Sequence, residues 1–286
     1  MLYQSPQSTS EVVNLLAKTK GNVHILAGGS DLLVRMKGGF IEPDLIVDIK
    51  RVKSMGQIKK TADGFLIGAA VSCAAMRSNK ALVKAWPGVV EASHLIGSDQ
   101  IQSRCTMAGN LCNASPAADS VPALIAADAI AIVQGPKGER RIPVAKIVTA
   151  PGKTSLKKGE VVEALLLPPR KTKSADAYLR FTPRTEMDIA VVGAAVNVVL
   201  DGKTQVIEAR VSLGAVAPTP LLIPKAAKAL IGSKLEEAAI DKMAAACADA
   251  CNPIDDKRGT IDYRIKVAKV LSARAAALAY TRAGGK

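Results

Sequence analysis

A short apolar strand that ends in two glycines constrains the N-terminal part of this chain more than any other feature. Residues 23–27 are apolar enough for a buried strand, and Gly28-Gly29 then interrupts it. Ser30-Asp31 can cap a helix that runs to about residue 37, and residues 45–49 supply a second buried strand. The pattern predicts a compact β-loop-α-β unit that ends at about residue 52.

The glycine pair also indicates a use for this loop. Two glycines between a strand and a helix let the backbone approach a bulky anion, and free N–H groups there can point at phosphate oxygens. The donors would be the backbone N–H groups of Gly29, Ser30, Asp31 and Leu32. An ordinary tight turn is the alternative. The spacing is not that of the GxGxxG fingerprint of Rossmann folds.

A second polar segment, residues 97–122, is dense in Ser, Gly, Asn, Asp and Pro. We expect a long loop here, and a loop of this length inside a compact domain usually has a function. Its groups suit the binding of a long polar ligand better than acid–base catalysis: they are those of Thr106, Gly109, Asn110, Ser115 and Asp119. From composition alone, the segment is either a binding site or a surface loop.

Composition narrows the class of protein. Hydrophobic residues make up 49% of the 286 residues and charged residues 22%, so the chain is globular rather than disordered. Aromatic residues make up only 3%, which disfavours the stacking surfaces of single-strand nucleic-acid binders. The net charge of +14 fits nucleic acid, an anionic ligand or an acidic protein partner. The basic stretch 257–286 is either a solvated helix face or a docking face.

Cysteine and histidine patterns argue against several other sites. Five cysteines without a CxxC pair, together with only His24 and His94, give no zinc or iron–sulfur spacing. Both histidines have apolar neighbours and are predicted to be core residues. Gly152-Lys153-Thr154 resembles the end of a P-loop, but Ile147 stands at its first glycine. The first residues lack a secretory pattern and no apolar run could span a bilayer, so we expect a cytoplasmic protein.

Periodic patterns predict most of the remaining elements. A hairpin is expected at residues 56–71, a strand at 161–167 and a second hairpin at 190–213. Helices are expected at residues 8–20, where STSE forms a capping box, and at 80–95, 225–231, 235–251 and 263–280. The basic stretch RKTKS, residues 170–174, is the best candidate for a domain boundary.

The chain resembles the FAD-binding medium subunits of molybdenum hydroxylases, the family of xanthine dehydrogenase and carbon monoxide dehydrogenase flavoproteins. The likeness lies in the ordered motifs AGGSDLL, IGAAVS and TMAGNLCNASPAAD, and it continues through PGKTSLKKGEVV and RTEMDIAVVGAAV. It implies an α+β protein with the vanillyl-alcohol-oxidase (PCMH)-type FAD-binding fold. Two α/β subdomains, residues 1–52 and 53–173, would precede an α+β domain of the CO dehydrogenase flavoprotein C-terminal type, residues 174–286.

The resemblance also implies which residues bind FAD. The first loop would wrap the pyrophosphate through Ile25, Leu26, Ala27, Gly28, Gly29, Ser30, Asp31 and Leu32. The second stretch of the cofactor would be held by Thr106, Gly109, Asn110 and Asp119, with Gly68 close to it. By a looser alignment, Val162 would lie by the flavin ring and Arg180 near it. Ala108 stands where the family usually has glycine, and Arg184-Thr185 where it usually has two arginines.

The function that the resemblance implies is electron transfer. Such a subunit takes electrons from a small [2Fe-2S] subunit and passes them to an external acceptor, while a large subunit hydroxylates the substrate at molybdopterin. FAD would be bound non-covalently, in a dimer of heterotrimers without nucleic acid. Two alternatives stay open: a stand-alone flavin-dependent oxidoreductase with its own substrate pocket, and a basic non-enzymatic binding protein. The sequence names neither the substrate nor the acceptor.

Overall fold

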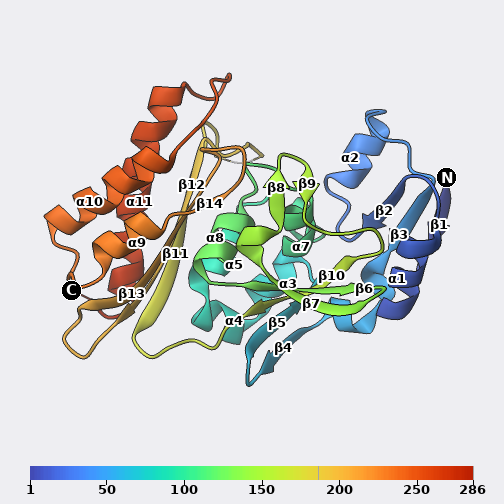
Figure 1. Cartoon of the computed structure of the whole chain (residues 1–286), viewed down its shortest axis with the longest axis horizontal. Helices are drawn as coiled ribbons and strands as arrows, with labels where there is room; N and C mark the ends of the chain where they lie inside the picture. Colours follow the sequence, from blue (N-terminus) through green and yellow to red (C-terminus); the bar gives the residue numbers. More distant parts are fainter. Residues whose placement is uncertain (186, 286) are drawn as a thin grey trace.

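The computed structural model describes residues 1–185 and 187–285. Glu186, in the RTEMDIA motif, and Lys286, at the end of the basic stretch, lie outside them. Three main sheets follow one another along the chain and along the long axis of the molecule (Figure 1). The N-terminal and C-terminal sheets lie at opposite ends, with the five-stranded sheet between them.

The N-terminal sheet has three parallel strands in the order β1-β3-β2, which are β1 (Leu2–Gln4), β2 (Val23–Leu26) and β3 (Leu45–Asp48). Helix α1 (Thr9–Lys18) begins after Ser8, whose hydroxyl accepts a hydrogen bond from the Glu11 N–H as the STSE pattern predicts. Helix α2 (Leu32–Lys37) follows the glycine pair and buries none of its residues. The predicted β-loop-α-β unit is confirmed, with β1 as an added edge strand.

The middle sheet is antiparallel, in the order β4-β5-β10-β6-β7. Its strands are β4 (Ile58–Thr61), β5 (Gly64–Gly68), β6 (Ile130–Gly135), β7 (Gly138–Pro143) and β10 (Val161–Leu167). The predicted hairpin at 56–71 and the predicted strand at 161–167 are confirmed. Short connecting elements complete this part: β8 (Val148–Ala150), β9 (Lys153–Thr154) and the 3-10 turns Ile49–Arg51, Lys53–Gly56 and Val144–Lys146.

Two predictions for the middle part, a helix at 80–95 and a long loop at 97–122, are wrong. The helix expected at 80–95 is two helices, α4 (Lys80–Ala85) and α5 (Pro87–His94), because Pro87 lacks the N–H that would continue α4 and instead begins α5. The segment 97–122 is not a long loop: it contains α6 (Asp99–Gln102), α7 (Met107–Cys112) and the start of α8 (Ser120–Ala126). These helices are too short for a periodic pattern. Helix α3 (Cys73–Ser78) begins after Ser72, whose hydroxyl accepts a hydrogen bond from the Ala75 N–H.

The C-terminal sheet is antiparallel in the order β11-β12-β13-β14, with strands β11 (Ser174–Phe181), β12 (Val192–Leu200), β13 (Val206–Gly214) and β14 (Leu221–Leu222). Three helices pack beside it (Figure 1), namely α9 (Pro224–Leu230), α10 (Glu237–Ala250) and α11 (Ile261–Arg282). The predicted hairpin and the three predicted helices are confirmed. Strand β11, which follows the expected boundary stretch, was not predicted.

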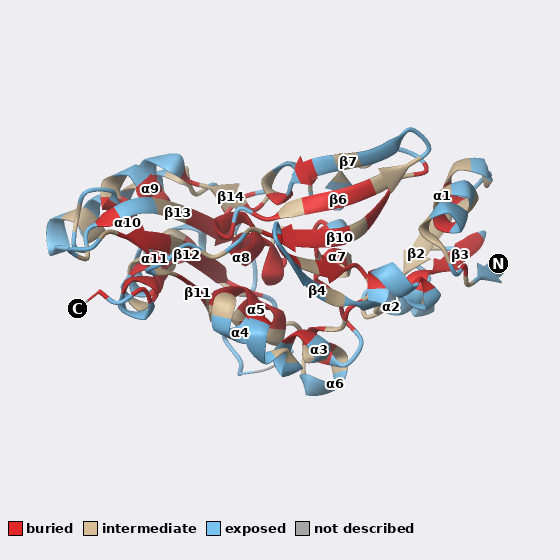
Figure 2. Cartoon of the chain, turned by 90° about the horizontal axis from the view of Figure 1, so that it is seen from below, coloured by how far each residue is buried: buried red, intermediate tan, exposed pale blue. Residues whose placement is uncertain are grey.

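Two large hydrophobic cores support these sheets. The larger one joins the N-terminal and middle sheets and includes Trp86 and Leu124, while the second lies between the C-terminal sheet and its helices. Helix α8 is buried along its whole length (Figure 2). Within the described ranges, none of the helices has the length and apolar character needed to cross a bilayer.

Candidate functional site

A cavity of about 570 Å³ lies where the N-terminal sheet meets the middle part of the chain. Three stretches supply most of its wall: residues 23–35 around the glycine pair, residues 105–113 around α7, and residues 154–162 before and within β10. The two polar segments that the sequence singled out therefore share one cavity. A third stretch, inside the PGKTSLKKGEVV motif, joins them.

The two glycine loops touch each other directly at Gly28. A Cβ atom at Gly28 would lie 2.2 Å from the carbonyl oxygen of Arg104, so only glycine fits between the loops. Gly29 has a φ of +81°, a left-handed conformation that other residues adopt only under strain. Asn113 also joins the loops, because its side-chain amide donates to Asp31 Oδ1 at 3.1 Å. The backbone contact at Gly28, the left-handed Gly29 and the Asn113–Asp31 hydrogen bond together fix the arrangement of the two segments.

The second loop is organised by side chains that cap and link helices. The Thr106 hydroxyl accepts a hydrogen bond from the Gly109 N–H at 2.9 Å and so caps α7. Asn110 Oδ1 accepts from both the N–H and the hydroxyl of Ser120, at 3.1 and 2.7 Å. This leaves the Asn110 amide nitrogen as a donor on the cavity wall.

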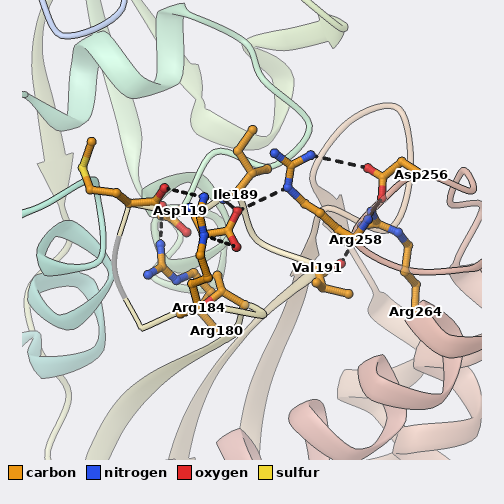
Figure 3. A network of polar contacts seen from close by, with 11 residues as sticks. Asp119, Arg180, Arg184, Ile189, Val191, Asp256, Arg258 and Arg264 are labelled. Atoms are coloured by element: carbon orange, nitrogen blue, oxygen red, sulfur yellow. Dashed lines mark hydrogen bonds and ion pairs between the residues drawn. The ribbon is translucent and has the colours of Figure 1, made fainter.

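Asp119 and Arg180 form an enclosed ion pair behind this loop (Figure 3). Arg180 Nη1 donates to Asp119 Oδ2 at 3.1 Å and to the Leu95 carbonyl oxygen at 2.5 Å, and the Arg180 side chain is only 5% exposed. Burial raises the pKa of Asp119 to about 6, although Arg180 opposes this shift. Asp119 Oδ1 has no hydrogen-bond partner among the described residues.

Comparison with known proteins identifies the kind of site. Residues 1–170 match the family described as FAD binding domain in molybdopterin dehydrogenase, and residues 177–279 match the CO dehydrogenase flavoprotein C-terminal domain. The chain belongs to the FAD-binding medium subunits of molybdenum hydroxylases. It is therefore an oxidoreductase subunit with the PCMH-type FAD-binding fold that the motifs implied.

Relatives of this flavoprotein subunit match it over nearly their whole length. It is 30% identical to the carbon monoxide dehydrogenase medium chain of Hydrogenophaga pseudoflava, over 98% of this chain and 97% of the relative. It is 27% identical to the xanthine dehydrogenase FAD-binding subunit of Escherichia coli O157:H7, over 99% and 97%. A chain of the Cu,Mo-CO dehydrogenase structure superposes with a TM-score of 0.94 at 30% identity, over 98% and 97%.

Most of the residues that the resemblance assigns to FAD binding lie on the wall of this cavity. Those on its wall are Ile25, Ala27, Gly28, Gly29, Ser30, Asp31, Leu32, Thr106, Gly109, Asn110 and Val162. Gly68 is not on the wall, because it packs where a Cβ atom would lie 2.3 Å from the Met55 carbonyl oxygen. Leu26 also lies off the wall, and Asp119 and Arg180 face each other instead of the cavity.

Four nitrogen-bearing side chains on the cavity wall were not predicted from the sequence, those of His24, Arg35, Asn113 and Lys158. His24 is a wall residue rather than the predicted core residue, and burial together with the Arg35 charge lowers its pKa. Arg35 lies four residues after Asp31, a spacing that puts both on one helix face. Lys158 lies in the PGKTSLKKGEVV motif. His94 is partly buried, with its Nε2 atom enclosed and without a partner among the described residues.

The donor set fits FAD. An anionic pyrophosphate needs backbone N–H donors and cations, which the Gly28–Leu32 loop, Arg35 and Lys158 supply. Flat rings need apolar walls, which Ile96 and Val162 provide. Among the described residues, no group of three or more His, Cys, Asp or Glu side chains could hold a metal ion. The arrangement suits binding of a long anionic cofactor.

Proposed function

We propose that this chain binds one FAD non-covalently in the cavity and passes electrons from an iron–sulfur subunit to an external acceptor. The observation that carries this proposal is the direct contact of two glycine loops on one wall, at Gly28 and Arg104. FAD, when bound, supplies the redox chemistry, and the protein supplies binding, orientation and electrostatics.

Different residues would bind different parts of the cofactor. Backbone N–H groups from Gly29 to Leu32 would hold the pyrophosphate, with Arg35 and Lys158 balancing its charge. Thr106, Gly109 and Asn110 would hold the second stretch, and Val162 would contact a ring. Asp119, Arg180, Leu26 and Gly68 would act behind the wall by fixing the backbone that lines it.

The partners would be a large molybdopterin subunit and a small [2Fe-2S] subunit, assembled as a dimer of heterotrimers in the cytoplasm. The relatives support this, since one matched structure is that of a Cu,Mo-CO dehydrogenase and one matched curated protein is a carbon monoxide dehydrogenase medium chain. The net charge of +14 suits an acidic partner. We also propose residues 1–52, 53–173 and 174–286 as its three structural units.

Flavin content tests the proposal. Wild-type protein purified with FAD should show the visible absorbance of oxidised flavin, and acid precipitation should release all the colour into the supernatant. Colour retained in the pellet would show a covalent link. In Gly29→Val, a β-branched residue at a φ of +81° should add about 1–3 kcal/mol of strain, which lowers FAD affinity roughly ten- to a hundredfold.

The matched control is Gly202→Ala. Gly202 has no positive φ, and no atom lies within 4 Å of the Cβ that alanine would add. Gly138, in the β6–β7 turn, is not a suitable control, because its φ of +95° would strain an alanine. Gly202→Ala should therefore retain its flavin. A folded Gly29→Val chain with full FAD occupancy at low micromolar cofactor would overturn the assignment of the first loop.

A further inference from the structure

Two of the five cysteines oppose each other beside the cavity. Ser72 and Thr106 form an isolated antiparallel bridge, and Cys73 and Cys105 are the next pair along it. The Cys73 N–H donates to the Cys105 carbonyl oxygen at 2.9 Å. Opposing side chains project from the same face, and the Cα atoms of a hydrogen-bonded pair are about 5.5 Å apart, within the roughly 4.4–6.8 Å that a disulfide spans. The backbone therefore places the two thiols where a disulfide can form.

The two thiols differ in acidity. A side-chain hydrogen bond links them, and it lowers the pKa of Cys105, although burial opposes this shift. The same hydrogen bond, together with burial, raises the pKa of Cys73. Because the thiolate is the nucleophilic form of cysteine, Cys105 is the sulfur of the pair that reacts first with an oxidant.

Access to this pair runs through the cavity and reaches Cys105. This residue is on the cavity wall, next to Arg104, whose carbonyl oxygen contacts Gly28. Cys105 is 2% exposed, and Cys73 is fully buried at the start of α3. A small oxidant in the cavity therefore meets Cys105 before Cys73, and a ligand that fills the cavity covers Cys105.

The two cysteines of α10 provide a contrast within the same chain. Cys247 Sγ donates to Met243 Sδ at 3.7 Å, and Cys251 Sγ donates to the Cys247 carbonyl oxygen at 3.2 Å, so neither thiol is directed at the other sulfur. Burial raises the pKa of Cys247 to about 11 and that of Cys251 to about 12. Both should therefore stay reduced under conditions that oxidise Cys105.

We propose that Cys105 and Cys73 are a peroxide-sensitive thiol pair in the cavity wall, which forms a disulfide when no ligand occupies the cavity and is shielded when a cofactor fills it. The thiol pair is argued from contacts within this chain, whereas the identification of the shielding ligand as FAD rests on the proposed function. A chain without its flavin would thus acquire a reversible covalent modification that an FAD-loaded chain does not.

The reaction with hydrogen peroxide has two steps. The Cys105 thiolate attacks one peroxide oxygen, an S–O bond forms as the O–O bond breaks, and the released hydroxide takes a proton to become water. The Cys73 sulfur then attacks the Cys105 sulfur, an S–S bond forms as the S–O bond breaks, and the second hydroxide takes the Cys73 proton. The two thiols lose two electrons in total, and one peroxide becomes two waters.

The experiment uses the full chain, freed of FAD and reduced. The chain is treated with hydrogen peroxide, its remaining free thiols are blocked with iodoacetamide in denaturant, and it is digested with trypsin. Mass spectrometry should show peptide 61–77, which contains Cys73, linked to peptide 105–137, which contains Cys105. Dithiothreitol should separate the two peptides by thiol–disulfide exchange, and Cys247 and Cys251 should carry the blocking group. Absence of the linked peptide after peroxide treatment would overturn the proposal.

Cys112→Ser is the matched control, because Cys112 is an exposed residue of the same wall and of the same tryptic peptide as Cys105. The link should persist in Cys112→Ser and vanish in Cys105→Ser, and the opposite result would assign the link to Cys112 and remove Cys105 from the pair. Cys73→Ser should stop at a Cys105 sulfenic acid, which dimedone traps. Oxidation of Cys73 in Cys105→Ser would refute the order of attack.

Titration with FAD tests the shielding. At an FAD concentration of about ten times its Kd, about one chain in eleven is free, so the disulfide should form about tenfold more slowly. The FAD concentration that halves the rate should equal the Kd measured from the visible absorbance of the bound flavin. Bound FAD that leaves the rate unchanged would overturn the shielding and leave the proposed function intact. A chain that binds no FAD would overturn the proposed function, and the linked peptide would still decide whether the thiol pair exists.

Discussion

The cavity and the joint between the middle part and the C-terminal sheet use polar groups in opposite ways. On the cavity wall, the Asn110 amide nitrogen and the cations of Arg35 and Lys158 face open space. At the joint, polar groups are turned on each other, as in the enclosed Asp119–Arg180 pair. The comparison shows that a polar segment can offer donors to a ligand only where those donors have no partner within the protein.

Asp176 and Arg170 form a second ion pair at the joint. Asp176, on β11, accepts from the Val89 N–H at 2.9 Å and so holds the first turn of α5. Arg170 donates to Asp176 at 3.0 Å and stacks on the Trp86 ring with its guanidinium carbon 4.0 Å from the ring centre. A Cβ atom at Gly88 would lie 2.7 Å from Asp176, so the helix and the strand are in close contact.

The joint also supports the cavity indirectly, through α8. Arg180 holds Asp119 before the first residue of this helix, and Arg210 donates to the Ile125 carbonyl oxygen near its end, at 3.0 and 3.1 Å. Ser120, the first residue of α8, is the partner that orients Asn110. Two arginines of the C-terminal sheet thus fix the helix on which a cavity residue depends.

The largest fall in the free energy of unfolding is expected when one charge of the joint is removed. Arg180→Met would leave the carboxylate of Asp119 enclosed without its cation, and loss of one member of a buried pair destabilises by about 3–5 kcal/mol. Chemical denaturation measures this as a fall in the free energy of unfolding. The double variant Arg180→Met with Asp119→Asn should recover part of the loss, because the uncompensated charge is gone.

The control for that experiment is an exposed ion pair of the same sheet. Lys171 and Glu208 are 58% and 54% exposed, so Lys171→Met should change the free energy of unfolding by less than about 1 kcal/mol. Equal effects of Arg180→Met and Lys171→Met would show that burial at the joint does not strengthen its ion pairs. Pairing of polar groups at the joint would then add no more to the stability of the fold than an exposed ion pair does.

A smaller change in the free energy of unfolding is expected when Asp176 titrates. Burial raises the pKa of Asp176 from 3.8 to about 6, although Arg170 opposes the shift. Between these values the folded chain keeps a proton that the unfolded chain has released, so stability falls as pH rises from about 4 to about 6 and then levels off. The shift corresponds to about 2–3 kcal/mol for this one group.

Asp176→Asn isolates that contribution. The asparagine keeps an oxygen for the Val89 N–H but cannot ionise, so its free energy of unfolding should lack this fall between pH 4 and pH 6. The measurement is the difference between variant and wild type in denaturation curves across this pH window. If both lose stability in parallel, the Asp176 carboxylate is not the titrating group.

The sequence predicted most of the elements and both loops of the cavity, for a physical reason. Strand β10 is a nearly continuous apolar run and helix α11 buries a periodic face, and both patterns are local information. Helices as short as α6 and α7 have no recognisable period, so the sequence predicts a loop at 97–122. The pairing of Asp119 with Arg180 joins residues far apart in the chain, and nothing local in either segment shows that they meet.

His24 shows the same limit at the cavity. Its apolar neighbours in β2 predicted a buried side chain, and only the arrangement of three separate stretches places it on the wall. The contact between the two glycine-containing segments also depends on the tertiary structure and cannot be predicted from either segment alone. The sequence shows two glycine-containing segments, whereas the requirement for glycine at position 28 comes from the Arg104 carbonyl oxygen.

The smallest effect, and the one that acts on the cavity itself, is expected from Gly28→Ala. The added Cβ would lie 2.2 Å from the Arg104 carbonyl oxygen and 2.7 Å from the Cys105 Cα, and these backbone atoms cannot rotate away. The loops must separate, at a cost of about 1–3 kcal/mol, which lowers FAD affinity roughly ten- to a hundredfold if both loops bind the cofactor. Titration with FAD measures this, with Gly202→Ala as the control. A Gly28→Ala chain that is less stable but binds FAD like wild type would mean that the glycine contact is a second joint, and that the cofactor depends on one loop alone.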